Sequence, residues 1–297
     1  MNRNLAWRSV LTILLGLPLI FYGIPHGWRP VGRESRSLFQ GIEYRREVRS
    51  HPRSLVIHQV AIDLMAPGIG VFVTPGNATQ DNTETNARTT SEFLRAFRLQ
   101  LAINANFFWY FREKTPWDYF PKSGDRVNTV GQSISNGITY SAAEPTWSAL
   151  CFSIDHHARI EKSGDCPIGT QQAVAGSTML VNQSKPLKAQ ENTADSDGLY
   201  SRTVAAVDQR GEKLWIIAVD DKQPLYSEGV TLAEMTALVM ELGAYAAINL
   251  DGGGSTTLVT ETSSGIKILN SPIHTKIPLR ERPVANHLGF YAKPKEN

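Results

Sequence analysis

The chain contains little cysteine and carries no excess of charge of either sign. Its 297 residues include two cysteines, Cys151 and Cys166, and neither a Cys-x-x-Cys pair nor a cysteine and histidine spacing typical of zinc. We therefore expect no structural zinc site. In an oxidising compartment the two cysteines could pair as a disulfide, and two buried thiols are the alternative. The 30 basic and 28 acidic side chains leave a net charge of +2, which gives no reason to expect a nucleic-acid partner.

One long uncharged stretch stands near the N-terminus. Arg3 and Arg8 precede residues 9–28, a run of 20 residues without a charged side chain, and a bilayer-spanning helix needs about 20. We interpret residues 1–28 as an export signal. It is either an uncleaved signal-anchor, which the lack of a small-x-small cleavage site favours, or a cleaved signal peptide. A buried N-terminal helix is the remaining alternative. With both arginines in the cytoplasm, the rest of the chain would be extracytoplasmic, either anchored to the membrane (in the periplasm or at the cell surface) or secreted.

The residues after this stretch have the composition of one globular domain. With 41% hydrophobic residues, the chain can bury a substantial core. Residues 29–53 are rich in arginine and lack a long apolar period, which predicts a linker, and residues 54–294 are then predicted as one domain. Apolar residues alternate in residues 55–65, which lead through a Pro-Gly turn to residues 70–73, a pattern typical of a hairpin.

Strand patterns outnumber helix patterns along the rest of the chain. Two capping boxes, Thr89 with Glu92 and Thr231 with Glu234, open the two clear helices. Alternating or continuous apolar residues predict further strands at residues 147–154, 158–162, 173–181, 201–208, 213–220 and 289–292. We therefore predict an α+β fold with a large mixed, mostly antiparallel sheet system and two main helices.

Each predicted helix leads into a strand that ends in Ala-Ile-Asn. Superposing the two helix–strand units places Asn104 with Asn249 and Asn106 with Asp251. Our hypothesis is an internal helix–strand pseudo-repeat that brings both strand ends to one shared site. The alternative is that Ala-Ile-Asn is merely a common way to end a strand.

The second of these strands runs straight into a glycine-rich segment. Its residues are Asp251, Gly252, Gly253, Gly254, Ser255 and Thr256. Glycines allow positive φ and let another molecule approach the backbone closely. Successive backbone N–H groups in such a bend can form an anion-binding nest, which would place a phosphate near the carboxylate. A glycine bulge or hairpin turn without a ligand is the alternative.

Several motifs occur in a family-like order. They are residues 104–108 (NANFF), 175–181, 201–205 (SRTVA), 229–232 (GVTL), 249–256 (NLDGGGST) and 282–286 (RPVAN). Together they resemble the phosphodiester glycosidase family, over residues 54–294. The resemblance implies a catalytic domain that hydrolyses the bond between a sugar anomeric carbon and a phosphodiester oxygen, in a sugar-phosphodiester or polysaccharide substrate. The chain departs from the family in having Asn106 where glycine is commoner. It also lacks the cysteine-rich modules of animal members, so their lysosomal targeting chemistry does not carry over.

Cleavage of a sugar phosphodiester needs a phosphate binder and a carboxylate near the anomeric carbon. Arg202 and Arg282 are candidate phosphate clamps, because a guanidinium fork matches two phosphate oxygens, and surface salt bridges are the alternative for each. Asp251 is the leading candidate for base, nucleophile or stabiliser of positive charge, with Glu281 and Asp220 as second choices. The leaving phosphodiester is already acidic, so one carboxylate could suffice. Retention and inversion both stay open.

Other polar residues are candidates for orienting the substrate. Sugar hydroxyls could bind Asn104, Asn249 and Asn286, although each could equally hold a turn. The three glycines with Ser255 and Thr256 are candidate phosphate donors. His274 could protonate a leaving oxygen or simply face solvent. The aromatic residues in 109–125 could form a sugar-stacking wall or a lid, and core packing or a partner surface is the alternative.

The sequence calls for no definite cofactor and leaves three classes of protein open. A divalent cation bound by Asp251 with Asp220 or Asp221 would fit phosphate chemistry. The first choice is an exported phosphodiester glycosidase that acts on an envelope or extracellular glycoconjugate and contacts the membrane through its N-terminal segment. A metal-dependent phosphodiesterase that breaks the P–O bond is the rival enzyme. A non-catalytic polysaccharide-binding or envelope-assembly protein is the rival from another class.

Overall fold

The structure is a computed structural model that describes residues 29–77, 83–187 and 198–295. The predicted export signal, residues 1–28, lies outside the described residues, so the choice between signal-anchor and signal peptide stays a prediction. No helix within the three described ranges is both long enough and apolar enough to span a membrane.

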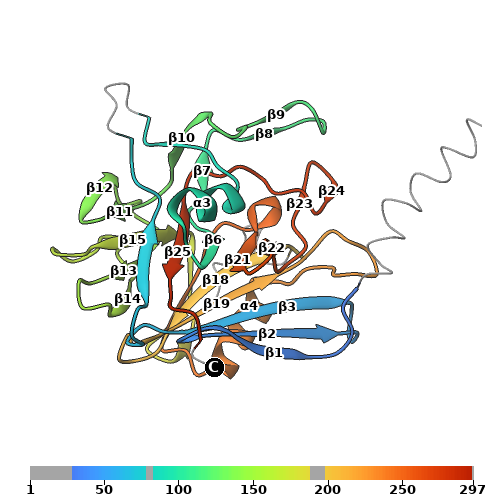
Figure 1. Cartoon of the computed structure of the whole chain (residues 1–297), viewed down its shortest axis with the longest axis horizontal. Helices are drawn as coiled ribbons and strands as arrows, with labels where there is room; N and C mark the ends of the chain where they lie inside the picture. Colours follow the sequence, from blue (N-terminus) through green and yellow to red (C-terminus); the bar gives the residue numbers. More distant parts are fainter. Residues whose placement is uncertain (1–28, 78–82, 188–197, 296–297) are drawn as a thin grey trace, which may run out of the picture.

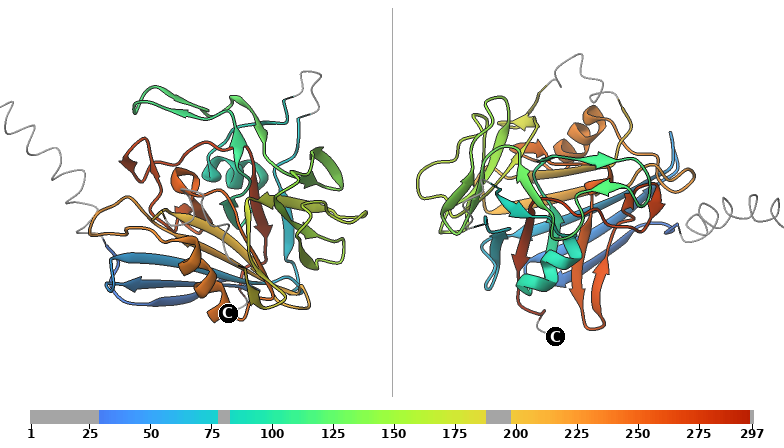
Figure 2. Two further views of the ribbon diagram at one scale, coloured as in Figure 1. Left: turned by 180° about the vertical axis from the view of Figure 1, so that it is seen from behind. Right: turned by 90° about the horizontal axis from the view of Figure 1, so that it is seen from above.

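An eight-stranded antiparallel sheet forms the base of the molecule (Figure 1). In spatial order its strands are β1 (Glu34–Phe39), β2 (Ile42–Arg49), β3 (Leu55–Asp63), β19 (Lys213–Val219), β18 (Arg202–Val207), β20 (Ala246–Asn249), β16 (Thr178–Asn182) and β17 (Lys185–Pro186). Helix α4 (Leu232–Glu241) crosses one face of this sheet, as the views in Figure 2 show. It buries Leu232, Met235 and Leu238 against apolar side chains of β3, β18 and β19.

Two five-stranded antiparallel sheets lie on the opposite face. The first contains β22 (Gly265–Ile268), β21 (Leu258–Thr262), β6 (Leu101–Asn104), β25 (His287–Tyr291) and β4 (Gly70–Val73). The second contains β12 (Ile138–Ser141), β11 (Ser133–Ser135), β15 (Gln172–Gly176), β13 (Ser148–Phe152) and β14 (Ala158–Glu161). The main core fills the space between these sheets and the large sheet. Helix α3 (Thr90–Phe97) packs Phe93 and Leu94 on the outer side of β6 and β21.

Short elements extend from the upper edge of these layers (Figure 1). They are a three-stranded sheet of β5 (Thr85–Asn86), β10 (Arg126–Thr129) and β7 (Phe108–Trp109), the hairpin of β8 (Arg112–Glu113) and β9 (Tyr119–Phe120), the hairpin of β23 (Ile273–His274) and β24 (Ile277–Pro278), and the 3-10 turn η2 (Gly253–Ser255). The predicted α+β class with two helices is confirmed.

Both predicted capping boxes are present. The Thr89 hydroxyl accepts the Glu92 N–H (3.2 Å), and the Glu92 carboxylate accepts the Thr89 N–H (2.8 Å). Thr231 and Glu234 repeat this arrangement at the start of α4. Each box gives hydrogen-bond partners to otherwise unpaired N–H groups of the first turn, so local sequence determines where each helix begins.

The linker prediction for residues 29–53 is wrong for the strands β1 and β2. β2 pairs with β3 along its whole length and buries Ile42 and Tyr44 in the core. The period was hidden because arginines alternate with these apolar residues. Glu47, only 7% exposed, lies within ion-pair distance of three of those arginines, so charged residues here cover the sheet instead of marking a flexible segment.

The hairpin predicted from residues 55–65 and 70–73 is also wrong. β3 pairs with β2 and β19, whereas β4 pairs with β25 in another sheet. The turn after β3 therefore carries the chain from one layer to the next. Local alternation cannot distinguish a hairpin from such a crossing, since both place a turn between two half-buried strands.

Other sequence predictions are confirmed. The strands predicted at residues 201–208 and 213–220 are β18 and β19, which pair antiparallel across the turn that contains Gly211, and those predicted at 147–154 and 158–162 are β13 and β14, which form a hairpin. Of the two alternatives that the sequence left open for the cysteines, the structure has the disulfide between Cys151 on β13 and Cys166, with Cα atoms 5.8 Å apart.

Candidate active site

The ends of the two Ala-Ile-Asn strands meet, as the pseudo-repeat hypothesis predicted. β6 lies between β21 and β25, and β20 lies between β18 and β16, so each is an interior strand that follows a capped helix. The Asp251 N–H donates to the carbonyl oxygen of Ala105 (2.9 Å), and the Asn104 side-chain amide donates to the carbonyl oxygen of Asp251 (2.6 Å). Two sheets are thereby joined at the residue that precedes the glycines.

The predicted sugar-binding asparagines are buried at this junction. The side-chain oxygen Oδ1 of Asn104 accepts hydrogen bonds from the Thr257 N–H (3.1 Å) and the Thr203 hydroxyl (3.2 Å). Asn286 accepts the backbone N–H of Asn106 (2.8 Å) and is fully buried. Asn249 is 2% exposed, and its amide faces Ser177. Asn104 and Asn286 hold strand ends together, which is the alternative that the sequence left open for them. The side-chain oxygen of Asn249 is buried and has no hydrogen-bond partner among the described residues.

The glycine-rich bend passes close to two other segments of the chain. A Cβ placed on Gly252 would lie 2.5 Å from the carbonyl oxygen of Ser201, and a Cβ on Gly254 would lie 2.5 Å from Arg282 Nη2. Gly253 has φ +58°, and among the described residues no heavy atom lies within 4 Å of its would-be Cβ. Gly252 and Gly254 are therefore required because Ser201 and Arg282 lie too close for a side chain, whereas Gly253 is favoured because its φ is positive.

Arg282 connects the bend to two neighbouring hairpins. Its Nη1 donates to the Ser255 hydroxyl (3.2 Å), and its Nη2 lies 2.7 Å from the Glu113 carboxylate on β8. Its guanidinium carbon lies 4.4 Å from the centre of the Phe111 ring, a cation–π distance. Nε donates to Nδ1 of His274 (3.3 Å). Arg282 is thus held at the bend by contacts on several sides.

His274 is uncharged at neutral pH. Burial, together with the Arg282 guanidinium, lowers the pKa of its imidazole to about 4. Glu113, whose carboxylate lies 3.5 Å from Nδ1, opposes this shift. Because Nδ1 accepts a hydrogen bond from Arg282, we assign the imidazole proton to Nε2. His274 therefore orients the guanidinium and does not repel it.

A cavity of about 350 Å³ opens beside the bend. Its lining residues are Glu113, Lys222, Gly254, Ile273, Lys276 and Arg282. Three cationic side chains and one carboxylate surround it, so it favours an anion. Of the residues that the sequence singled out, Gly254 and Arg282 line it.

Arg202 lies at the other end of the bend. Its Cα would be 3.6 Å from a Cβ on Gly252, and its side chain is 4% exposed. The guanidinium donates to the carbonyl oxygens of Gly198 (3.4 Å) and Val230 (3.5 Å) and lies over the Tyr200 ring. Lys222, from the cavity lining, lies over the same ring at 5.7 Å. The two predicted arginines thus flank one bend, with Arg282 alone lining the cavity.

Asp220 and Glu281, the second-choice carboxylates, accept hydrogen bonds from residues away from the cavity. Asp220 accepts hydrogen bonds from Asn270 (3.0 Å) and the Ser271 N–H (2.9 Å), and His58 lies 3.1 Å from its other oxygen. Glu281 accepts the Ser91 N–H (2.9 Å) in the first turn of α3, and burial raises its pKa. Neither lines the cavity. Asp251, the first choice, is 8% exposed at the start of the bend and is not among the lining residues either.

The carboxylates do not form a metal site. Asp221 is 1% exposed, and burial raises the pKa of its carboxyl. In the parts of the chain that the structure describes, no three carboxylate, histidine or cysteine side chains are grouped so that they could hold an ion. The site that the sequence left open for a divalent cation, Asp251 with Asp220 or Asp221, is therefore not a group of donors that could hold one.

Three cavity residues escaped the sequence analysis: Glu113, Lys222 and Lys276. Glu113 lies within residues 109–125, where aromatic and charged residues show no period, although they contain the β8–β9 hairpin. Trp109 and Trp117 in this segment are 68% and 83% exposed, as a sugar-stacking wall or a lid would require. The two lysines follow no motif, so only the folded chain shows that they lie beside Arg282.

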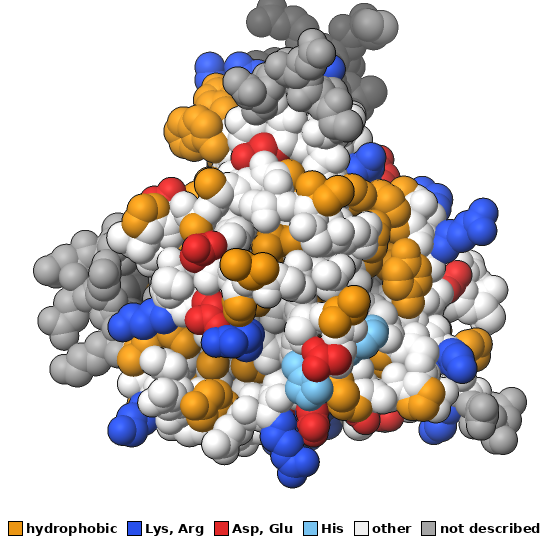
Figure 3. Space-filling model, turned by 90° about the vertical axis from the view of Figure 1, so that its left-hand side faces the viewer, with side chains coloured by type: hydrophobic (Ala, Val, Ile, Leu, Met, Phe, Trp, Pro, Cys, Tyr) orange, Lys and Arg blue, Asp and Glu red, His pale blue; other side chains and the backbone are white. Residues whose placement is uncertain are grey.

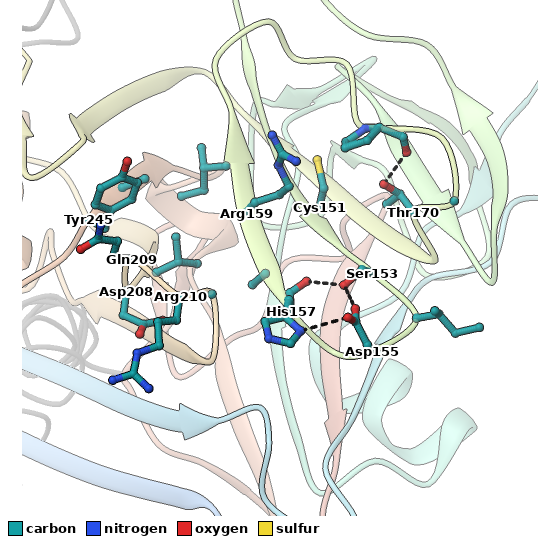
Figure 4. A pocket seen from close by; sticks show the side chains of 18 of the residues that line it. Cys151, Ser153, Asp155, His157, Arg159, Thr170, Asp208, Gln209, Arg210 and Tyr245 are labelled. Carbon is teal, nitrogen blue, oxygen red and sulfur yellow. Dashed lines mark hydrogen bonds and ion pairs between the residues drawn. The ribbon is translucent and has the colours of Figure 1, made fainter.

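A larger cavity, about 800 Å³, lies away from the bend (Figure 4). It is formed by the β13–β14 hairpin, the β18–β19 turn and Tyr245. Figure 3 views the side of the molecule on which β13 and β14 lie, and there histidine and carboxylate side chains lie together. Within the cavity the Ser153 hydroxyl bonds to Asp155, and Asp155 lies 3.3 Å from His157. Since the imidazole does not contact the hydroxyl, this group is no activated nucleophile.

Solved structures share this fold at low sequence identity. A hypothetical protein from Synechocystis superposes with a TM-score of 0.61 at 15% identity, covering 89% of this chain and 64% of that one. The catalytic domain of zebrafish N-acetylglucosamine-1-phosphodiester alpha-N-acetylglucosaminidase, auto-inhibited by its pro-peptide, gives 0.60 at 18% identity and 89% coverage of both chains. A putative exported protein from Burkholderia pseudomallei gives 0.58 at 12% identity, covering 87% of this chain and 96% of that one.

Sequence comparison places the chain in a family. YomE, an uncharacterized protein of Bacillus subtilis derived from the SPbeta prophage, is 30% identical over 190 residues, which are 60% of this chain and 27% of that protein. The chain thus spans about a quarter of the length of this curated relative. The phosphodiester glycosidase family model matches residues 97–291, more than half of the chain. The chain therefore belongs to the phosphodiester glycosidase family.

Proposed function

We propose that the protein is an exported glycosidase that hydrolyses the bond between a sugar anomeric carbon and a phosphodiester in an envelope or extracellular glycoconjugate. The observation that carries this proposal is the position of Arg282, which lies against Gly254 in a cationic cavity at the bend that follows Asp251. Family membership supports the reaction class, and the zebrafish domain of similar fold is named for cleaving a sugar-1-phosphodiester.

The phosphodiester would bind at Arg282. A guanidinium presents two parallel N–H groups to two phosphate oxygens, and here His274 and Phe111 fix its plane. Glu113 occupies one N–H group, so an incoming phosphate would replace or share that contact. The leaving phosphate is a weak base, so it needs no proton donor to depart. Arg282 would stabilise the negative charge that develops on it.

Asp251 is the proposed carboxylate at the anomeric carbon. Its backbone N–H and carbonyl oxygen are both hydrogen-bonded to the end of β6, which fixes the start of its side chain relative to the bend. From the start of the bend it would either activate water or attack the sugar, and Glu113 is the carboxylate that lines the cavity itself. In the overall reaction one water adds its oxygen to C1 of the sugar, and the products are a free sugar and a phosphomonoester.

An exported location has separate support. A disulfide such as that between Cys151 and Cys166 persists in oxidising compartments and is rare in a reducing cytosol. Residues 1–28 have the charge pattern of an export signal. We therefore place the folded domain outside the cytoplasm.

A product assay tests the proposal. Purified protein is incubated with a panel of sugar-1-phosphodiesters that differ in the sugar, and free sugar and phosphomonoester are quantified together. We expect equimolar release of both from at least one member, and loss of both in an Asp251→Asn variant that still binds the substrate. Glycan binding by the wild type without turnover on any member would favour the non-catalytic alternative.

A further inference from the structure

The cavity beside Arg282 carries more positive charge than one phosphodiester can neutralise. Its cations are Arg282, Lys222 and Lys276, and its carboxylate is Glu113. Glu113 lies 2.7 Å from Arg282 Nη2 and offsets that guanidinium. His274 adds no charge, since its pKa is lowered to about 4. A bound phosphodiester has a single negative charge, so one lysine would stay uncompensated.

Neither lysine lies within salt-bridge distance of a carboxylate in the described parts of the chain, and the charge of Lys222 acts on the buried carboxyl of its neighbour Asp221. The Lys222 ammonium lies over the Tyr200 ring, and Lys276 is an exposed residue at the tip of the β23–β24 hairpin. Exposed lysines also occur on solvated surfaces, so charge alone does not identify a binding site. The backbone supplies a second, independent observation.

Both lysines have a backbone conformation that lysine disfavours. The φ angle is 53° at Lys222 and 61° at Lys276. In this left-handed region Cβ crowds the carbonyl oxygen, and glycine or asparagine enters it most readily. Strain of this kind is concentrated at functional sites. Eight other non-glycine residues in the described parts of the chain also have positive φ, and of these ten only Lys222 and Lys276 line the cavity.

The β23–β24 hairpin shows this cost clearly. His274 pairs with Ile277, so Thr275 and Lys276 form a two-residue loop, and Thr275 also has positive φ, at 53°. Two-residue loops with two positive φ values strongly favour Asn-Gly. This chain has Thr-Lys instead. The Thr-Lys loop is therefore less stable than an Asn-Gly loop would be, and its lysine lines the anion cavity.

We propose that the substrate carries at least one further anionic group, a phosphate or a carboxylate, beside the phosphodiester that is cleaved, and that Lys222 and Lys276 bind it. This inference rests on the proposed function, in which Arg282 holds the cleaved phosphodiester. It makes the substrate a polyanionic glycan chain or a sugar phosphodiester with a charged aglycone, and it excludes a conjugate whose only charge is the scissile phosphate.

Two sugar-free probes test the inference by calorimetric titration of the purified protein. Glycerophosphoglycerol has one phosphodiester, and a chain of three glycerols joined by two phosphodiesters has two. We expect the second probe to bind about tenfold more tightly. In a Lys222→Gln, Lys276→Gln double variant that advantage should fall to about the twofold expected from having two phosphates. The matched control, Arg159→Gln with Arg210→Gln, removes the same charge from the larger cavity and should keep the tenfold difference.

Each other outcome has a distinct meaning. If the wild type binds both probes equally well, the inference is overturned and the phosphodiester site at Arg282 stands. If it binds neither probe, the phosphate-binding role of Arg282 in the proposed function is overturned as well.

Backbone strain provides a separate test through Lys276→Asn. Asparagine tolerates positive φ, so the melting temperature should stay the same or rise, while the preference for the doubly charged probe falls. Leu279→Asn is the matched control, because Leu279 has φ 60°, is 52% exposed and does not line the cavity. It should have the same effect on stability and none on probe binding. A lower melting temperature for Lys276→Asn with an unchanged preference would show that the lysine is structural and contradict the inference.

Discussion

Ser201 and Gly253 are joined by two reciprocal hydrogen bonds. The Ser201 hydroxyl donates to the carbonyl oxygen of Gly253 (2.5 Å), and the Gly253 N–H donates to the carbonyl oxygen of Ser201 (2.9 Å). This pair fastens the start of β18 to the glycine-rich bend. Arg202 directly follows Ser201, and Asp251 is two residues before Gly253. The pair therefore brings together Arg202 and Asp251, which lie 49 positions apart in sequence.

Ser201→Ala is expected to loosen the bend. It removes one of the two hydrogen bonds, while the Gly253 carbonyl oxygen still accepts the Thr256 N–H (3.2 Å), so the free energy of unfolding should fall by about 1 kcal/mol. Turnover should fall about tenfold, because the bend positions Asp251 relative to Arg282. Urea unfolding and kcat/KM measure the two effects. Unchanged turnover would mean that this clamp does not position the site.

The two glycines at positions 253 and 254 should respond differently to alanine. In Gly254→Ala the new methyl group would overlap Arg282 Nη2, so we expect at least a hundredfold loss of kcat/KM (about 2.7 kcal/mol). In Gly253→Ala the methyl group meets open space, and the cost is the positive φ, about 1–2 kcal/mol of stability with little loss of turnover. Equal losses of turnover in both variants would contradict this explanation of the motif.

Arg282→Lys should not preserve function. Lysine keeps the positive charge but loses the planar pair of N–H groups and the packing on Phe111. We expect kcat/KM to fall about a hundredfold, with the melting temperature within a few degrees of the wild type. Activity close to that of the wild type would show that point charge, and not the guanidinium fork, is what the site uses.

Acid should destabilise the fold through His274. Its pKa is about 4 in the folded state against 6.5 for the free side chain. The unfolded chain therefore binds a proton first, and the stability due to neutral His274 is full above pH 6.5 and is lost as the pH falls toward 4. Buried Glu281 has a raised pKa and acts in the opposite direction, so a variant isolates the histidine. The free energy of unfolding of His274→Asn should decline less steeply than that of the wild type between these pH values. Parallel slopes would contradict the assignment.

Loss of the disulfide should affect stability and not chemistry. Replacing Cys151 and Cys166 by alanine opens a loop with a sequence separation of 15. The chain-entropy model gives a cost of about 3 kcal/mol. Since Cys151 lies in the larger cavity and not beside Arg282, kcat/KM at low temperature should be unchanged. A large loss of turnover in the folded variant would link the second five-stranded sheet to the active site.

Local signals explain which parts of the fold could be predicted. Both helices begin at capping boxes that involve residues three apart. The β18–β19 hairpin could be predicted because a short turn that contains Gly211 joins its two strands directly. Residues 34–49 were missed because arginine can cover a sheet while its charge stays in water, which hides the strand period. The partner of β4 is β25, more than 200 residues later, and no local pattern encodes that choice.

The site was predicted where it follows a compact motif and missed where it is assembled from distant loops. Asp251 and the glycines form one continuous segment, and Arg282 was found through a family-like motif. Glu113, Lys222 and Lys276 come from three separate segments of the chain and meet only because the β8–β9 and β23–β24 hairpins project toward the same bend. For Asn104 and Asn286 the sequence left sugar binding and the holding of a turn equally open, and here both side chains satisfy buried backbone N–H groups.

Hydrolysis in water enriched in ¹⁸O tests the central claim most directly. If the protein breaks the bond between the anomeric carbon and the phosphodiester oxygen, mass spectrometry should find the label at C1 of the released sugar and none in the phosphomonoester. Label in the phosphate would show that the P–O bond is broken, and it would contradict the glycosidase account.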